Sequence, residues 1–252
     1  MIDTHCHLYD KKIINDLEQI VKNAHKANIS KMICIGDNID TSKQSVAISS
    51  EYEQIYASFG VHPHEAKDVS ELYLDIIKKN MSNKKVVAIG EIGLDYHYNF
   101  SDQTIQKKIF SEQLELANEV DLPTIVHCRD SDDDLYNCIK NSKNHKGVIH
   151  CFSSNLNFAK KIIELGYFIS FTGMVTFVKE LEPVIKEINL TNIMIETDAP
   201  YLAPIPFRGK INQPAYVIEI AKKIAEIKKI ELEKVIHQTT KNAYLLFEKL
   251  SN

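Results

Sequence analysis

Short apolar runs alternate with longer amphipathic stretches along almost the whole chain. The apolar runs are rich in Ile and Val and are bounded by polar residues or glycine, which is typical of strands buried on both faces of a parallel sheet. We predict eight such strands, over residues 1–7, 31–36, 55–61, 86–92, 123–128, 146–152, 167–172 and 192–198.

Between and after these runs, apolar residues recur at helical spacing. We predict helices over residues 13–28, 41–52, 70–81, 103–120, 131–142, 155–165, 178–188, 214–228 and 231–249. Each strand and its helix take about 31 residues, the size of one βα unit, and no Gly/Ser/Pro-rich linker divides the chain. We therefore expect residues 1–252 to form a single (β/α)8 TIM-barrel domain of the α/β class.

Composition and charge limit the cellular compartments and the classes of partner that we expect for this barrel. No apolar run approaches the roughly 18 residues of a membrane span, and no basic segment followed by an apolar one opens the chain, so we expect a cytoplasmic protein. The 5 cysteines show no CxxC spacing, which argues against a disulfide framework and a thiolate zinc cage. A net charge of -4 gives no overall basic field, so any contact with nucleic acid depends on a local patch.

Potential metal ligands end six of the eight predicted strands. In a barrel of this kind the active site lies at the carboxyl ends of the strands, so these side chains should meet at one rim. A pair such as His5 and His7 could arise by chance, but a rim shared by six strands is much harder to explain in that way. The residues at these strand ends are His5, His7, His62, His64, Glu91, Asp95, His127, His150 and Asp198.

Three cysteines lie next to candidate histidines and could compete as zinc ligands. Neighbouring residues in a strand point to opposite faces. If the histidines face the barrel interior, then Cys6, Cys128 and Cys151 face the helices and pack there as small apolar side chains.

Four histidines, one glutamate and one aspartate are too many ligands for one tetrahedral zinc ion with an open position, but they suit two ions that share a carboxylate. Such a pair would activate a water and stabilise a displacement at phosphorus, and Asp198 would also accept the proton of that water. The N/O ligands suit Zn, Mn, Ni or Mg. We predict that one ion is held by His5, His7 and Asp198, the other by His127 and His150, and that Glu91 bridges both.

Cations beside the rim suggest how a substrate phosphate is bound. Arg129 follows a candidate ligand directly, and Arg208 and Lys210 lie in the segment PFRGKINQPAYV. The planar guanidinium fits phosphate oxygens, although Arg129 could instead pair with the aspartates that follow it, and Arg208 could cap its loop. His62 either contacts the phosphate or shapes the turn through Pro63. We expect His62, Arg129, Arg208 and Lys210 to bind substrate.

Seven motifs in order, DTHCHL, GVHPHEA, GEIGLDY, HCRD, HCFS, ETDAPYLAP and RGKINQP, resemble the TatD family of metal-dependent DNases in the amidohydrolase superfamily. The resemblance implies a (β/α)8 barrel and a divalent-metal site at the ligand positions predicted above. It also implies hydrolysis of DNA, chiefly 3′-5′ exonuclease action on single-stranded ends in repair or turnover, with Mg supporting activity and Zn often bound. The last motif usually reads RGKRNEP; here Ile211 and Gln213 remove one positive and one negative charge beside the pocket.

Two other functions compete with a nuclease. Related barrels use a similar metal cluster on small esters, amides or lactones. A non-enzymatic scaffold could instead offer the helix 231–249 as an interaction surface, although its Ile236, Tyr244, Leu246 and Phe247 are better explained by closing the flank of the barrel. No obligate protein partner is indicated.

Overall fold

The computed structural model describes residues 1–98, 100–143 and 145–251. Eight parallel strands form one sheet in the order β1 to β8. The first strand meets the segment after the last strand through a bridge between Cys6 and Ala199, with the His7 amide 2.7 Å from the Ala199 carbonyl oxygen. The strands are β1 (Ile2–Cys6), β2 (Lys31–Cys34), β3 (Ile55–Phe59), β4 (Val86–Asp95), β5 (Thr124–Arg129), β6 (Gly147–Ile149), β7 (Phe168–Phe171) and β8 (Ile193–Ile195).

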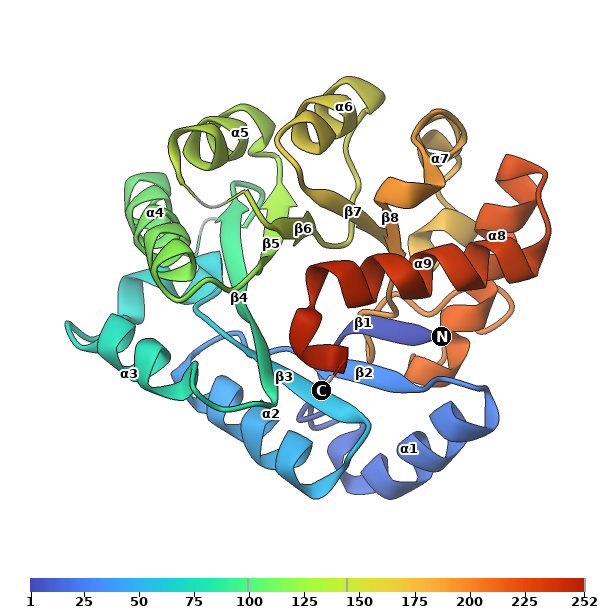
Figure 1. Cartoon of the computed structure of the whole chain (residues 1–252), viewed down its shortest axis with the longest axis horizontal. Coiled ribbons are helices and arrows are strands. Elements are labelled where there is room, and N and C mark those ends of the chain that lie inside the picture. The colour runs from blue at the N-terminus through green and yellow to red at the C-terminus, as the bar shows by residue number, and fades with distance from the viewer. Residues whose placement is uncertain (99, 144, 252) are drawn as a thin grey trace.

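Helices surround this sheet as an outer layer (Figure 1), which confirms the predicted (β/α)8 barrel. The predicted helix 178–188 is divided, because a 3-10 turn at Lys179–Leu181 precedes α7 and Pro183 lies in the first turn of that helix, where its missing N–H costs nothing. The helices are α1 (Leu17–Lys26), α2 (Ile39–Glu51), α3 (Tyr73–Asn80), α4 (Gln103–Glu119), α5 (Asp132–Asn141), α6 (Leu156–Glu164), α7 (Glu182–Glu187), α8 (Val217–Lys228) and α9 (Leu232–Leu246).

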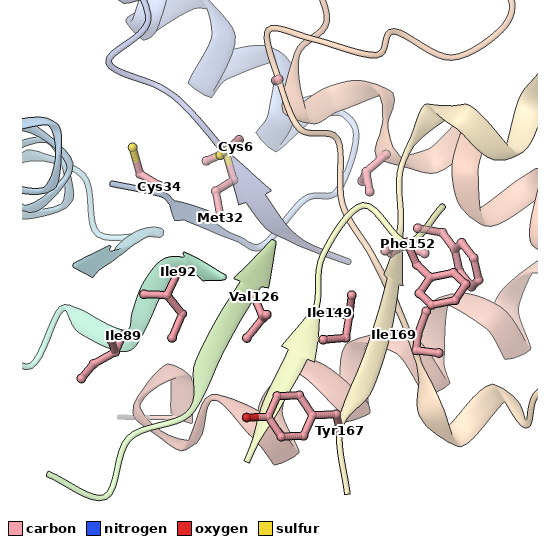
Figure 2. Packing of buried hydrophobic residues seen from close by; sticks show 14 of the residues in the cluster. Cys6, Met32, Cys34, Ile89, Ile92, Val126, Ile149, Phe152, Tyr167 and Ile169 are labelled. Carbon is pink, nitrogen blue, oxygen red and sulfur yellow. The ribbon is translucent and has the colours of Figure 1, made fainter. Parts of the chain in front are cut away.

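The apolar core has an outer and an inner part. The outer part lies between the sheet and the helices and includes Met32, Val126 and Ile149 (Figure 2). The inner part fills the barrel with the alternate strand residues, among them Ile33 and Ile125. Within the described residues, no helix has both the length and the apolar character needed to cross a membrane.

The inner core is closed from the amino ends of the strands by the segment after β8. Leu246 and Phe247 at the end of α9, and Leu250 in the following 3-10 helix, join the inner cluster of buried side chains. The α9 helix crosses this end of the barrel in Figure 1. Leu246 and Phe247 therefore close the amino end of the barrel and not the flank that the sequence predicts, because they fill the space inside the sheet. The carboxyl ends of the strands are left for polar side chains.

Strand alternation decides which side chains reach that polar end. Ile125 belongs to the inner cluster and His127 lies two residues further along β5, whereas Val126 belongs to the outer cluster. Cys6 is fully buried in the outer cluster and its thiol donates to the Ile33 carbonyl oxygen at 3.4 Å. Cys128 is also packed against the outer cluster. The packing of Cys128 follows from the same alternation along β5, whereas β1 reaches the predicted packing of Cys6 through a register shift between Asp3 and Cys6.

Candidate metal centre

The first group of candidate ligands comes from β1 and from the segment after β8. The Nε2 atoms of His5 and His7 lie 3.2 Å apart. Oδ1 of Asp198 lies 3.3 Å from Nε2 of His7 and 3.6 Å from Nε2 of His5. Asp198 has a left-handed backbone (φ 55°), and its amide donates to the His5 carbonyl oxygen at 2.9 Å, which fixes this approach. Residues far apart in sequence thus present three donor atoms to one point.

The second group comes from β4, β5 and the end of β6. Nδ1 of His127 lies 3.2 Å from Nε2 of His150. Oε1 of Glu91 lies 2.7 Å from that atom of His150 and 3.1 Å from that atom of His127, while Oε2 of Glu91 lies 3.3 Å from Nε2 of His5. The carboxylate of Glu91 therefore stands between the two groups, with one oxygen toward each.

These separations can be tested against metal coordination. Zinc lies about 2.0–2.2 Å from its N and O ligands, so two atoms on one ion must be within about 4.4 Å of each other. Every donor separation given above within a group meets this condition. Imidazole nitrogens and carboxylate oxygens are also donors that Zn and Mn accept. The residues present fit divalent metal ions.

Close backbone packing brings β4 and β5 together at this point. Gly93 in β4 pairs with His127 in β5, and its φ of 137° lies outside the range that other residues favour. A Cβ atom on Gly93 would lie 2.0 Å from the His127 carbonyl oxygen. Glycine is therefore required here if His127 is to reach Glu91.

The electrostatics of the centre favour a cation. Burial lowers the pKa of the His7 imidazole, but the carboxylates of Asp37 and Asp198 outweigh it and raise this pKa to about 10. Burial acts to raise the pKa of Glu91, yet the surrounding imidazoles, that of His150 foremost, hold it well below its usual value. Ionised carboxylates thus draw positive charge into the centre, and a divalent ion supplies such charge in the same place.

Two carboxylates outside the predicted ligand set, those of Glu196 and Asp95, orient the candidate ligands. Oε1 of Glu196 accepts from the Cys151 amide at 2.7 Å and lies 3.3 Å from Nδ1 of His150. Oδ2 of Asp95 lies 3.0 Å from Nε2 of His127. Such partners fix the ring position and tautomer of a metal-binding histidine. Asp95 is among the strand-end residues predicted from the sequence, and Glu196 lies near the end of the predicted strand 192–198, but a position at a strand end does not separate a ligand from its partner.

A third carboxylate, Asp37, supports His7 from the end of β2. Oδ1 of Asp37 lies 3.4 Å from Nδ1 of His7, and the Tyr9 hydroxyl, 3.0 Å from the same nitrogen, donates to Asp37. Asp37 directly follows the predicted strand 31–36, so the rim rule applied to that strand points to it. Nothing in the sequence indicates the part of Tyr9.

The predicted substrate residues divide into two pairs. A cavity of about 480 Å³ opens above the centre, and His62 and Arg129 are among its lining residues. His62 takes the turn-shaping position, because its Nδ1 accepts from the His64 amide, while its Nε2 lies 3.4 Å from Oε1 of Glu91. Its contact with substrate stays a prediction. Arg208 and Lys210 are absent from the described lining of this cavity.

Arg208 instead takes the loop-capping position. Its Nη1 donates to the Ala203 carbonyl oxygen at 3.0 Å, and its guanidinium lies 3.9 Å from the centre of the Phe177 ring. Lys210 lies over the ring of Phe207 at 5.8 Å. The alternative in which Arg129 pairs with nearby aspartates has no support in the described ion pairs, and its guanidinium lies 4.8 Å from the centre of the Tyr98 ring.

Comparison with known proteins gives a consistent result. Residues 2–248 match the family model described as TatD related DNase. The chain is 39% identical over 251 residues to the uncharacterized metal-dependent hydrolase YabD of Bacillus subtilis, with 98% of each protein covered. It is 32% identical over 256 residues to a protein of Klebsiella pneumoniae named 3'-5' ssDNA/RNA exonuclease TatD, with 98% of this chain and 97% of that protein covered. The crystal structure of YjjV, a TatD homologue from Escherichia coli, matches with a TM-score of 0.94 at 30% identity, with 98% of both chains covered.

Proposed function

Because this chain belongs to the family of TatD-related DNases and is a metal-dependent hydrolase, we propose that it removes nucleotides from the 3′ ends of single-stranded DNA. The observation that carries the proposal is the carboxylate of Glu91, which faces one group of nitrogen donors with each oxygen. The name of the Klebsiella relative supports the substrate and the direction of cleavage.

We assign two divalent ions, Mg, Mn or Zn, to this centre. His5, His7 and Asp198 would hold one ion, His127 and His150 the other, and Glu91 would bridge them. Two such ions lower the pKa of a water molecule and stabilise both the entering and the leaving oxygen at phosphorus.

The side chains around the proposed ions have different roles in the reaction. Interaction with His7 outweighs burial and lowers the pKa of Asp198, so this carboxylate is ionised at neutral pH and can accept a proton at the mouth of the cavity. Glu91 is buried and keeps its position between the two groups. Arg129 lines the cavity and offers its guanidinium to a phosphate, and burial keeps the pKa of His62 low, so a neutral imidazole meets the substrate.

An end-labelled single strand tests this proposal. Purified protein is incubated with the strand in EDTA, in Mg and in Mn, with the label at the 5′ end and, in a matched set, at the 3′ end. We expect a ladder of shortening 5′-labelled products in the two metals and early release of label from the 3′ end, with neither in EDTA. Intact strands under every condition would contradict a nuclease.

One observation favours a second function, hydrolysis of small esters, amides or lactones. The cavity is lined by several acids, including Asp37, Glu65 and Asp95, while Arg129 is its one arginine or lysine among the described lining residues. Its volume of about 480 Å³ falls in the range of small-molecule pockets. If small esters are turned over in Mn while DNA stays intact, this second function replaces the first.

A further inference from the structure

Exposed apolar side chains gather at the same end of the barrel as the candidate centre. Soluble proteins seldom leave adjacent large apolar groups in water unless something binds them. Several of the large apolar residues that are more than a third exposed lie in the loops that follow strands β4, β7 and β8. These residues are Tyr98, Phe100, Phe177, Tyr201, Ile205 and Ile211.

Two tyrosines among them line the cavity from opposite sides. Tyr98 follows β4 and Tyr201 follows β8, which are four strands apart in the order of the barrel. Each is 43% exposed and each carries a cation above its ring, Arg129 at 4.8 Å over Tyr98 and Lys12 at 4.8 Å over Tyr201. A flat apolar ring beside a positive charge matches a nucleotide, which joins a flat base to a negative phosphate.

Tyr98 has more aromatic neighbours described around it than Tyr201 has. The rings of Tyr98 and Phe100 stack with centroids 5.7 Å apart at an interplanar angle of 16°, and Phe100 is 55% exposed. His64 touches both rings edge-on, with centroids 5.6 Å from Tyr98 and 4.8 Å from Phe100. We call Tyr98, Phe100 and Arg129 the rim cluster.

The rim cluster is tied to the candidate centre through one carboxylate. Oδ2 of Asp95 lies 2.9 Å from Nε2 of His64 and 3.0 Å from Nε2 of His127. The exposed rings therefore have a set position relative to a candidate metal ligand. A base held on them would place its phosphate near the cavity in a defined way.

We infer that the rim cluster binds an unpaired base of a single-stranded nucleic acid, with Arg129 on an adjoining phosphate, and that Tyr201 and Lys12 form a second such contact across the cavity. This inference rests on the proposed function, because it supplies the way in which that nuclease would grip its strand. It also gives a reason for single-strand preference, since the bases of a duplex are already stacked on one another and cannot lie against protein rings.

Equilibrium binding tests the inference without cleavage. A fluorescent oligonucleotide with phosphorothioate linkages at its 3′ end is titrated in Mg, beside a set of otherwise identical strands that carry one abasic residue at successive positions. We expect one or two abasic positions near the 3′ end to weaken binding to the unmodified protein about ten-fold, the size of one lost stacking contact.

Variants then place the effect on the rim cluster. The double variant Tyr98→Leu with Phe100→Leu keeps apolar bulk and removes the rings, so it should lose the penalty at the abasic position that the rim cluster contacts, while any penalty at the Tyr201 position remains. Tyr98→Phe should behave like the unmodified protein. The matched control is Tyr136→Leu, because Tyr136 on α5 also lies under lysines, at 5.7 and 5.5 Å, and is away from the cavity.

Equal affinity of the unmodified protein for intact and abasic strands would overturn the inference, even if the double variant failed to fold. A double variant with normal thermal unfolding that keeps every abasic penalty of the unmodified protein would also overturn it. The proposed function is tested separately, by cleavage in Mg and Mn of DNA that carries no phosphorothioate linkages. Cleavage without any base preference refutes this inference alone, and base preference without cleavage refutes the nuclease alone.

Discussion

The two ends of the barrel treat charged side chains in opposite ways. At the carboxyl end, the side chains of His5, Glu91 and Asp198 are buried or nearly so and find their partners mainly in one another. At the amino end, Lys249 donates to the carbonyl oxygens of Met81 and Val86, both at 2.9 Å. One end holds charges that backbone oxygens satisfy, and the other holds charges that contact mainly one another.

Lys85 and Lys31 repeat the amino-end pattern. The ammonium of Lys85 donates to the carbonyl oxygens of Glu53 at 2.6 Å and Ile55 at 3.1 Å, and that of Lys31 donates to the Tyr56 hydroxyl at 2.8 Å. Although lysines line a cavity of about 600 Å³ there, these ammonium groups already have partners. A cluster of charged side chains therefore indicates an active site only where those side chains contact mainly one another and not backbone or hydroxyl groups.

The largest effect is expected at Glu91. Glu91→Gln keeps the size of the side chain but removes the charge that would bridge two ions, so nuclease activity should fall about a thousand-fold or more. Asp198→Asn should act in the same direction. Activity is measured on end-labelled single strands, and thermal unfolding in Mg should change little.

Glu115→Gln is the matched control for Glu91→Gln, since Glu115 is an exposed glutamate on α4. Its activity should equal that of the unmodified protein. A Glu91→Gln protein with unchanged cleavage would remove Glu91 from the centre and, with it, the contrast between the two ends.

A smaller loss is expected at Glu196, which positions His150 without facing the cavity. Glu196→Gln keeps an oxygen for the Cys151 amide and removes the negative charge beside the ring, so metal affinity and activity should fall about 10- to 100-fold. Competition with a metal-sensitive dye measures the affinity. Higher metal concentration should restore part of the activity, and a loss that metal cannot restore would count against a positioning role.

At the amino end, removal of a charged side chain should lower the stability of the fold without affecting activity. Lys249→Met leaves carbonyl oxygens such as those of Met81 and Val86 without their donor, so the free energy of unfolding should fall by about 1–3 kcal/mol. Urea unfolding measures it, and cleavage at 25 °C should stay normal.

Lys22→Met provides the control for Lys249→Met, because Lys22 makes an exposed ion pair with Glu18 on α1. Such pairs contribute little, so the unfolding midpoint should hardly move. Loss of activity in Lys249→Met at a temperature where the protein is fully folded would show that the amino end also serves the chemistry.

The smallest structural effect is expected on removal of metal. EDTA should stop cleavage while the far-UV circular dichroism keeps most of its intensity, because the inner and outer apolar clusters hold the barrel without ions. Collapse of that signal would mean that the carboxyl end contributes to folding as much as the amino end does.

Much of this arrangement follows from sequence periodicity. The strands start within two residues of their predicted positions, and the alternation along β5 correctly sends Ile125 and His127 inward and Val126 outward. Gathering of His5, His127 and the other candidate ligands at one rim then follows from the closed barrel. Their role as metal ligands stays a prediction.

The apolar periodicity of the sequence does not predict which side chains become partners, nor the conformation of the long loops. The sequence places Glu196 inside a strand that in fact ends at Ile195, and only the packed structure brings it to the Cys151 amide. Arg208 lies in a long irregular loop after β8, where periodicity says nothing, and its contact with Ala203 depends on the turns of that loop. The local pattern of apolar and polar residues determines which face of a strand a side chain occupies. The conformation of a long loop depends on contacts between residues that are distant in the sequence.

The apolar plug at the amino end also has a consequence for protein synthesis. Leu246, Phe247 and Leu250 are translated after every strand of the sheet, yet they complete the inner core that begins with Ile2. A ribosome-bound chain that has released β8 but not these residues lacks the side chains that join Ile33 and Val148 in the inner cluster. A chain cut short before Leu246 should therefore be less stable than the full chain, although it contains every strand of the sheet.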